Sequence, residues 1–149
     1  MEYFTFPLES LNVSQRYYDS GHIKHMTGTP KDYPIDIVGG DKGLRNAAFA
    51  RVDLKVLAKR GEYQSGVTNT VWLQTVNPVK TPTFEDYAFM TITHWNDNDS
   101  AMKKWNVGDI IPKGQIICYE GNDGCNDIHI HLTCGRGYCD DWDENSAGA

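Results

Sequence analysis

The sequence predicts an all-β domain, either an antiparallel sandwich or a partly open barrel of short hairpin strands. Apolar and polar residues alternate with a period of two in several segments, most clearly at residues 51–57. The period of 3.6 that marks amphipathic helices is almost absent, and glycine or proline separates the segments at short intervals. No repeat or linker is visible, so we expect one domain over residues 1–139 and an acidic, flexible tail over 140–149.

The composition narrows the function classes. Of the 149 residues, 40% are hydrophobic and 11% aromatic, which predicts a folded globule. The net charge of −6 and the absence of a basic stripe argue against a nucleic-acid partner. No apolar run approaches the length of a membrane span, and the start lacks the layout of a signal peptide. If Met1 is the natural start, we expect synthesis in a cytoplasm. The oligomeric state is not predicted.

The first half of the chain predicts short strands around one irregular loop. The strands are expected at residues 4–8, 11–17, 35–38, 51–57 and 70–76. Between residues 19 and 34, glycines and prolines break any periodicity, which predicts a loop that carries His22 and His25.

The second half continues the pattern. Residues 87–94 predict a strand that ends at His94. Asn, Asp and Ser at 96–100 are typical of the cap of a short helix, here at 101–105. Residues 107–115 predict a turn, a short strand and another turn, and 116–121 a buried strand. A loop at 122–127 then leads into a strand at 128–132.

This last strand carries a pair of histidines. His129 and His131 share one face of an extended strand, while Ile128, Ile130 and Leu132 share the other. Imidazole is the commonest metal ligand in proteins and titrates closest to neutral pH, so the pair could divide into one ligand and one proton carrier. From spacing alone, two surface histidines on a half-buried strand are an equally good interpretation.

Other residues could complete a metal site. Asp36 lies between two isoleucines, where a carboxylate is costly unless it is paired or bound to a cation, although an exposed edge position is also open. A hydrolytic zinc site needs three protein ligands, with water in the fourth position, and a separate base. The five histidines and Asp36 could furnish such a set.

The four cysteines all fall in the last third of the chain, which is uneven for a disulfide-framed secreted domain. We expect free thiols. One local disulfide remains open, as does a second metal site that uses Cys134 and Cys139.

Seven short motifs follow one another along the chain in an order that is typical of a known family. They lie at residues 6–8, 33–37, 69–74, 93–97, 107–115, 119–121 and 129–131. In this order the chain resembles the lysostaphin-type zinc endopeptidases, which cut peptide bonds in bacterial peptidoglycan, and especially the diverged versions of bacteriophage lysins and tail proteins. The resemblance covers nearly the whole chain, and it implies that residues 1–139 are a zinc peptidase domain of the all-β fold of that family.

The resemblance implies a role for each site residue. One Zn²⁺ would be held by a loop histidine, His25 in preference to His22, together with Asp36 and His131. His129 and His94 would be the catalytic histidines. In two places the sequence departs from the family. Asp32 stands four residues before Asp36, where the family's first histidine is expected, and Asn126-Asp127 replaces the usual glycine before the histidine pair.

The function implied is a phage-encoded, zinc-dependent endopeptidase of bacterial peptidoglycan. It would be made in the host cytoplasm and act at the cell wall, as a free lysin or as part of a virion. Two alternatives remain open. One is an inactive wall-binding or structural module of a phage tail or lysin with the same fold. The other is a purely structural metal site, with all four positions filled by protein, for instance by a cysteine.

Overall fold

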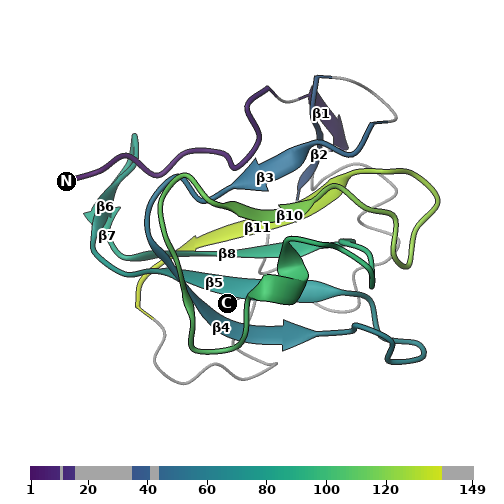
Figure 1. Cartoon of the computed structure of the whole chain (residues 1–149). Coiled ribbons are helices and arrows are strands. Elements are labelled where there is room, and N and C mark those ends of the chain that lie inside the picture. The colour runs from purple at the N-terminus through teal and green to yellow at the C-terminus, as the bar shows by residue number, and fades with distance from the viewer. Residues whose placement is uncertain (11, 16–34, 41–43, 139–149) are drawn as a thin grey trace, which may run out of the picture.

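An antiparallel sheet of seven strands dominates the fold (Figure 1). The computed structural model describes residues 1–10, 12–15, 35–40 and 44–138. The strand order in the large sheet is β1-β2-β11-β8-β5-β4-β9. Its strands are β1 (Asn12–Gln15), β2 (Ile35–Val38), β4 (Leu54–Arg60), β5 (Thr70–Thr75), β8 (Ala88–Thr93), β9 (Ile110–Ile111) and β11 (Ile130–Arg136).

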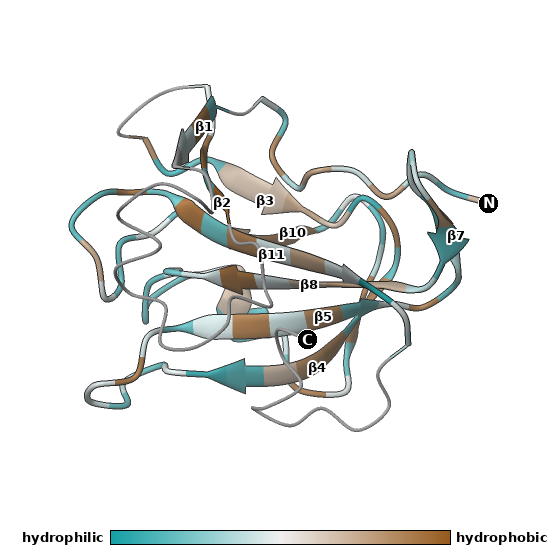
Figure 2. Cartoon of the chain, turned by 180° about the vertical axis from the view of Figure 1, so that it is seen from behind, coloured by the Kyte–Doolittle hydropathy of each residue, from teal (hydrophilic) through white to brown (hydrophobic). Residues whose placement is uncertain are grey.

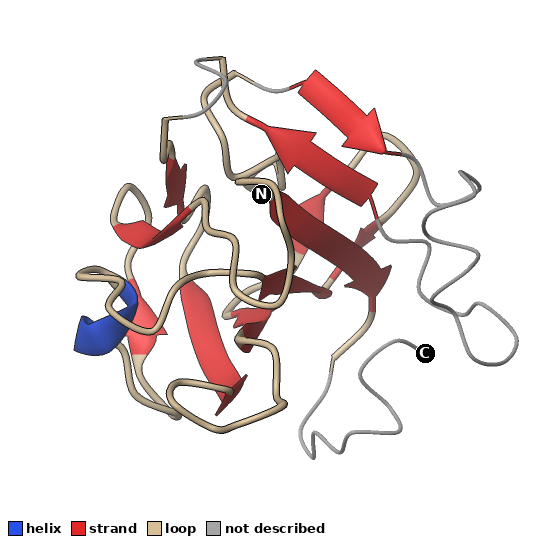
Figure 3. Cartoon of the chain, turned by 90° about the vertical axis from the view of Figure 1, so that its right-hand side faces the viewer, coloured by secondary structure: helices blue, strands red, loops and turns tan. Residues whose placement is uncertain are grey.

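Two small antiparallel pairs accompany the large sheet, β3 (Ala47–Phe49) with β10 (Ile116–Tyr119) and β6 (Val79–Lys80) with β7 (Glu85–Asp86). In the described part of the chain the one helix is a short 3-10 turn, η1 (Met102–Lys104), drawn blue in Figure 3. That part also contains no helix long and apolar enough to cross a membrane. The prediction of an all-β antiparallel fold is confirmed, as a sandwich, and the described strands close no barrel.

One face of the large sheet forms the core. Residues directly opposite each other on paired strands point to the same face. The pairings of Leu132 with Ile92 and of Ile92 with Val71 therefore line up aliphatic side chains across β11, β8 and β5. Ala48 and Ile117, from the β3–β10 pair, pack into the same fully buried cluster. Along β5 the two faces appear as alternating brown and pale residues in Figure 2.

The opposite face is polar and is arranged in rows. The first row joins Asp36, His131, Thr93 and Thr70 through consecutive strand pairings. The next row starts at Thr133 and continues into β8 and β5. The first row places Asp36 and His131, two of the three predicted metal ligands, on the sheet face that the core does not use.

Several boundaries differ from the sequence predictions. No strand forms at residues 4–8, where the backbone bends and Phe4 N instead donates to Lys80 O at 2.9 Å. β4 begins three residues late and ends at Arg60. β11 begins at Ile130, not at residue 128, because His129 pairs separately with Gly121. The sequence did not predict β3, β6 and β7, and the other described strands lie within or close to their predicted ranges.

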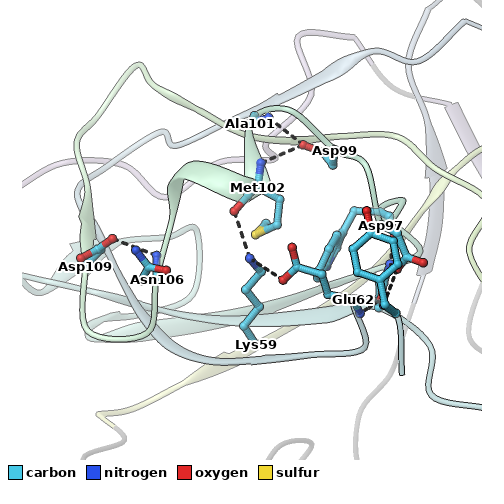
Figure 4. A network of polar contacts seen from close by, with 11 residues as sticks. Lys59, Glu62, Asp97, Asp99, Ala101, Met102, Asn106 and Asp109 are labelled. Carbon is cyan, nitrogen blue, oxygen red and sulfur yellow. Dashed lines mark hydrogen bonds and ion pairs between the residues drawn. The ribbon is translucent and has the colours of Figure 1, made fainter. Parts of the chain in front are cut away.

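The segment after β8 is tied to its surroundings by a polar network (Figure 4). Asp99 Oδ1 accepts from the amides of Ala101 and Met102 at 2.9 and 2.8 Å, although the N-cap position of the short helix is Ala101 and not one of residues 96–100. Lys59 Nζ donates to Met102 O at 3.2 Å and lies 3.0 Å from Glu62 Oε2. The chain that follows His94 is thereby anchored to β4.

Candidate metal and catalytic site

The pairing of β2 with β11 brings Asp36 and His131 together. The two residues are direct partners in the sheet, and His131 Nδ1 lies 2.9 Å from Asp36 Oδ1. Ile35 and Ile37 flank Asp36 and lie on the core face, so the alternation of the strand turns the carboxylate to the polar face. The Asp36 side chain is only 10% exposed.

His129 stands just before β11, in an isolated bridge with Gly121. Its Nδ1 lies 2.8 Å from the carbonyl oxygen of Asp127, and its Nε2 lies 3.5 Å from Asp36 Oδ1. A carbonyl oxygen only accepts hydrogen bonds, so Nδ1 carries the hydrogen. This bond orients the ring and leaves Nε2 facing the Asp36 carboxylate.

His94 completes a group of three imidazoles. Its ring centroid lies 4.6 Å from that of His129 and 5.8 Å from that of His131. His94 Nδ1 donates to Asp123 O at 2.6 Å, which leaves Nε2 as the free ring nitrogen.

The backbone at His94 is held in an unusual conformation. Its φ of 81° lies in the left-handed region, which costs a non-glycine residue of the order of 1 kcal/mol or more. His94 N donates to Asn69 O at 2.9 Å, and Asp123 N donates to His94 O at 3.2 Å. A Cβ at Gly121 would lie 2.1 Å from His94 O, so residue 121 must be glycine for this approach. Such strain persists where the surroundings fix it, often at functional sites.

Asn69 links the segments around His94. Its Nδ2 donates to Trp95 O at 2.8 Å and to Asp97 Oδ1 at 2.9 Å, while its own amide donates to Asp123 Oδ2 at 2.7 Å. Neither Asn69 nor Asp123 was predicted from the sequence to be a positioning residue. Both roles depend on contacts between distant segments, for which a single sequence carries no direct signal.

The charges of the group follow from these contacts. Burial acts to raise the pKa of Asp36, but hydrogen bonds with His129 and His131 hold it well below its usual range. Burial acts to lower the pKa of His129, and the interaction with Asp36 overcomes this and raises it. Burial lowers the pKa of His94 to about 4. At neutral pH, Asp36 is therefore ionised and His94 is uncharged in the metal-free protein.

Cys125 is a neighbour that the sequence analysis did not assign to the site. Its Sγ lies 3.8 Å from His129 Nδ1 and donates to Asp127 O at 3.4 Å. Its spacing of four residues from His129 is the one signal that could have pointed to it. His94, Cys125 and His129 each offer one ligand atom, and these atoms lie within 4.8 Å of one another, so the group could hold a metal ion. Cys118, Cys125 and Cys134 are free thiols, as expected.

The structure thus brings Asp36, His94, His129 and His131 together. His22, His25, Asp32 and Cys139 lie outside the described residues, as does the predicted tail at 140–149. A buried, ionised carboxylate against an imidazole nitrogen is a donor set that fits a divalent cation, and a third ligand has to come from elsewhere in the chain. In comparisons with known proteins, no family model and no curated protein matches this chain.

Proposed function

We propose that this chain is a zinc-dependent endopeptidase that hydrolyses peptide bonds in bacterial peptidoglycan. The observation that carries the proposal is the contact of Asp36 with His131, 2.9 Å apart on neighbouring strands, beside His129 and His94. These are the four described residues to which the lysostaphin-type resemblance assigns metal binding and catalysis. The proposal includes a phage origin, synthesis in the host cytoplasm and action at the wall.

Asp36 and His131 would hold the zinc, with His25 as the third ligand. Bound zinc would lower the pKa of a water ligand to about 7 and polarise the scissile carbonyl. Asp36 suits the role of ligand because it is ionised and nearly buried. His131 comes from the interior strand β11, which pairs with β2 on one side and β8 on the other, so its position is well fixed.

His129 and His94 would handle protons. A base must take a proton from the attacking water and pass it to the leaving amine. His129 suits this role because its Nδ1 is fixed by Asp127 O, and the neighbouring Asp36 raises its pKa in the metal-free protein. His94 would assist the transfer as an acceptor. In its neutral form Nδ1 donates to Asp123 O, so Nε2 has no proton to donate to an oxyanion.

The test uses the purified full chain and isolated peptidoglycan. We expect clearing of the suspension and release of new amino groups, loss of both after chelation, and recovery with Zn²⁺. His131→Ala should remove activity and bound zinc together. Val13→Ala, at an exposed position on the edge strand β1, serves as the matched control and should behave as wild type. Full activity in the presence of chelator, or in His131→Ala, would refute the proposal.

A second candidate is an inactive wall-binding module with the same fold. It is favoured by Asp32, which stands where the family's first histidine is expected. Such a module would sediment with peptidoglycan but contain no stoichiometric zinc, so metal analysis of the purified chain separates the two candidates.

A further inference from the structure

We propose that His94, Cys125 and His129 form a second metal position, separate from the Asp36–His131 pair, which takes a thiophilic divalent ion such as Zn²⁺ or Cd²⁺. When it is filled, both proton-handling histidines are occupied and peptide hydrolysis stops. Metal binding at this position stands on geometry alone. Inhibition rests in addition on the proposed peptidase function.

The three ligand atoms are close to the arrangement that zinc requires. Zinc binds sulfur at about 2.3 Å and imidazole nitrogen at about 2.0 Å, so neighbouring ligand atoms of a tetrahedral site lie roughly 3–4 Å apart. Cys125 Sγ and His129 Nδ1 already lie 3.8 Å apart, and no pair in the group exceeds 4.8 Å. Small side-chain rotations are sufficient to close the remaining distance.

The loop that carries Cys125 is fixed at both ends. On one side Asp123 Oδ2 accepts from Asn69 N, and on the other the Gly121–His129 bridge closes the loop. Cys125 is therefore held near the two histidines. Metal binding through His129 Nδ1 and the sulfur would break the hydrogen bonds that both make to Asp127 O. It would also release the thiol proton to solvent, because the thiolate is the form that ligates metals. The hydrogen on His129 Nδ1 would have to leave that atom, so the neutral ring would carry its hydrogen on Nε2, which faces Asp36.

The two metal positions have no residue in common. Asp36 and His131 would serve the first, and His94, Cys125 and His129 the second. Ions at the two positions do not compete for ligands, so both can be filled. The first ion is required for hydrolysis, whereas the second would remove His129 and His94 from proton transfer. Activity should therefore rise with the first equivalent of zinc and fall when zinc is in excess.

Cobalt tests the binding step directly. Metal-free full chain is titrated with Co²⁺, and thiolate coordination is followed by its charge-transfer absorption in the near ultraviolet. We expect this band in wild type and its loss in Cys125→Ser, with one fewer ion bound per chain. Cys134→Ser is the matched control, because Cys134 lines a separate apolar pocket of about 630 Å³ whose described lining includes no site residue. A band of equal strength in Cys125→Ser would overturn the proposal.

Asp36→Asn shows whether the two positions are separate. The cobalt–thiolate band should persist in this variant, because Asp36 belongs to the other position. Loss of the band would place the thiolate in one shared centre with Asp36 and would overturn the claim of a separate position. Alkylation gives a second readout. Excess Zn²⁺ should protect Cys125 from iodoacetamide and leave Cys134 unprotected, and equal labelling of Cys125 with and without Zn²⁺ would contradict the proposal.

Inhibition is measured as the ratio of peptidoglycan hydrolysis at excess zinc to that at equimolar zinc. We expect a decrease of about 10²-fold or more in wild type, the usual contribution of a general acid–base, and no decrease in Cys125→Ser. Equal inhibition of both proteins would overturn the inhibitory role. If wild type is inactive at every zinc concentration, the proposed peptidase function fails, whereas the cobalt band still decides whether the second metal position exists.

Discussion

The two faces of the large sheet are both well buried, yet they differ in chemistry. On the core face, Leu73, Met90 and Ile92 are at most 1% exposed and purely apolar. On the other face, Thr91 and Thr133 are each 6% exposed and polar. The same strands supply both sets, because successive residues alternate between the faces. Burial alone therefore does not separate scaffold from site in this protein, whereas the polarity of the buried row does.

Along the polar face, neutral and charged groups are separated. Thr70 and Thr93 share a hydrogen bond of 3.1 Å between their hydroxyls, and Gln74 Nε2 donates to Ala88 O at 2.8 Å. Hydrogen bonds within the sheet satisfy these neutral groups. Asp36 and His131, at the other end of the row that contains Thr93 and Thr70, instead place an ionised carboxylate against imidazoles. This contrast leads to four predictions, which begin with the largest expected effect.

On the polar face, His129→Ala should lower peptidoglycan hydrolysis by about 10²–10⁴-fold, the usual contribution of a general acid–base. Zinc content should stay at the wild-type level when one equivalent is supplied, because His129 is not assigned to that ion. His131→Ala, by contrast, should lose both peptidoglycan hydrolysis and bound zinc. Measurement of activity and metal content in the two variants checks the division of roles, and loss of stoichiometric zinc in His129→Ala would contradict it.

On the core face, Leu73→Ala should lower the free energy of unfolding by about 2–5 kcal/mol, because it opens a cavity at a fully buried position. Urea denaturation measures this. If the folded fraction still binds zinc at wild-type stoichiometry, the core face supports the site without belonging to it. Lys55→Ala, at an exposed position of β4, is the control and should change stability by less than about 0.5 kcal/mol.

The pH dependence of stability should distinguish His94 from an ordinary surface histidine. Its folded-state pKa of about 4 lies below the ordinary histidine pKa of 6.5, so between these values the unfolded state binds more protons. The contribution of His94 to stability is therefore complete above pH 6.5 and is lost as the pH falls toward 4. Urea denaturation of metal-free protein across this window should show a flatter pH dependence in His94→Gln than in wild type. An unchanged slope would refute the assignment.

The smallest effect is expected within the neutral part of the polar face. Thr93→Val removes the hydroxyl that pairs with Thr70 and should cost about 1 kcal/mol of stability. Zinc binding should be unaffected, although Thr93 is the direct neighbour of His131 in the sheet. Metal analysis together with denaturation checks this. Reduced zinc binding would show that the neutral threonine pair also orients the ligand.

Sequence alternation could predict which residues share a face. It predicted that Asp36 points to the sheet face opposite that of its flanking isoleucines, and that His131 points to the face opposite that of Leu132. The structure has both arrangements. It could not predict β3, whose Ala47–Phe49 segment is short and lacks a clear pattern. It also extended the final strand to His129, because the separate pairing with Gly121 depends on the intervening loop.

The candidate site could be predicted only in part from the sequence. The direct pairing of Asp36 with His131 depends on the register between β2 and β11, which lie far apart in the chain. The approach of Cys125 and the left-handed backbone of His94 depend on loop contacts made by Asn69, Gly121 and Asp123. Such contacts have no local periodicity, so a single sequence does not reveal them.

The position of β11 between β2 and β8 has a consequence for the order of assembly. Asp36 and His131 are 95 positions apart, and β11 is the only described strand that joins β2 to β8. Before β11 is added, the pair β1–β2 has no partner in the group formed by β8, β5, β4 and β9. Contacts of such long range form slowly, because the intervening chain must first be ordered. During synthesis from the N-terminus, the nascent chain therefore lacks the proposed hydrolytic centre until its last described strand has been made.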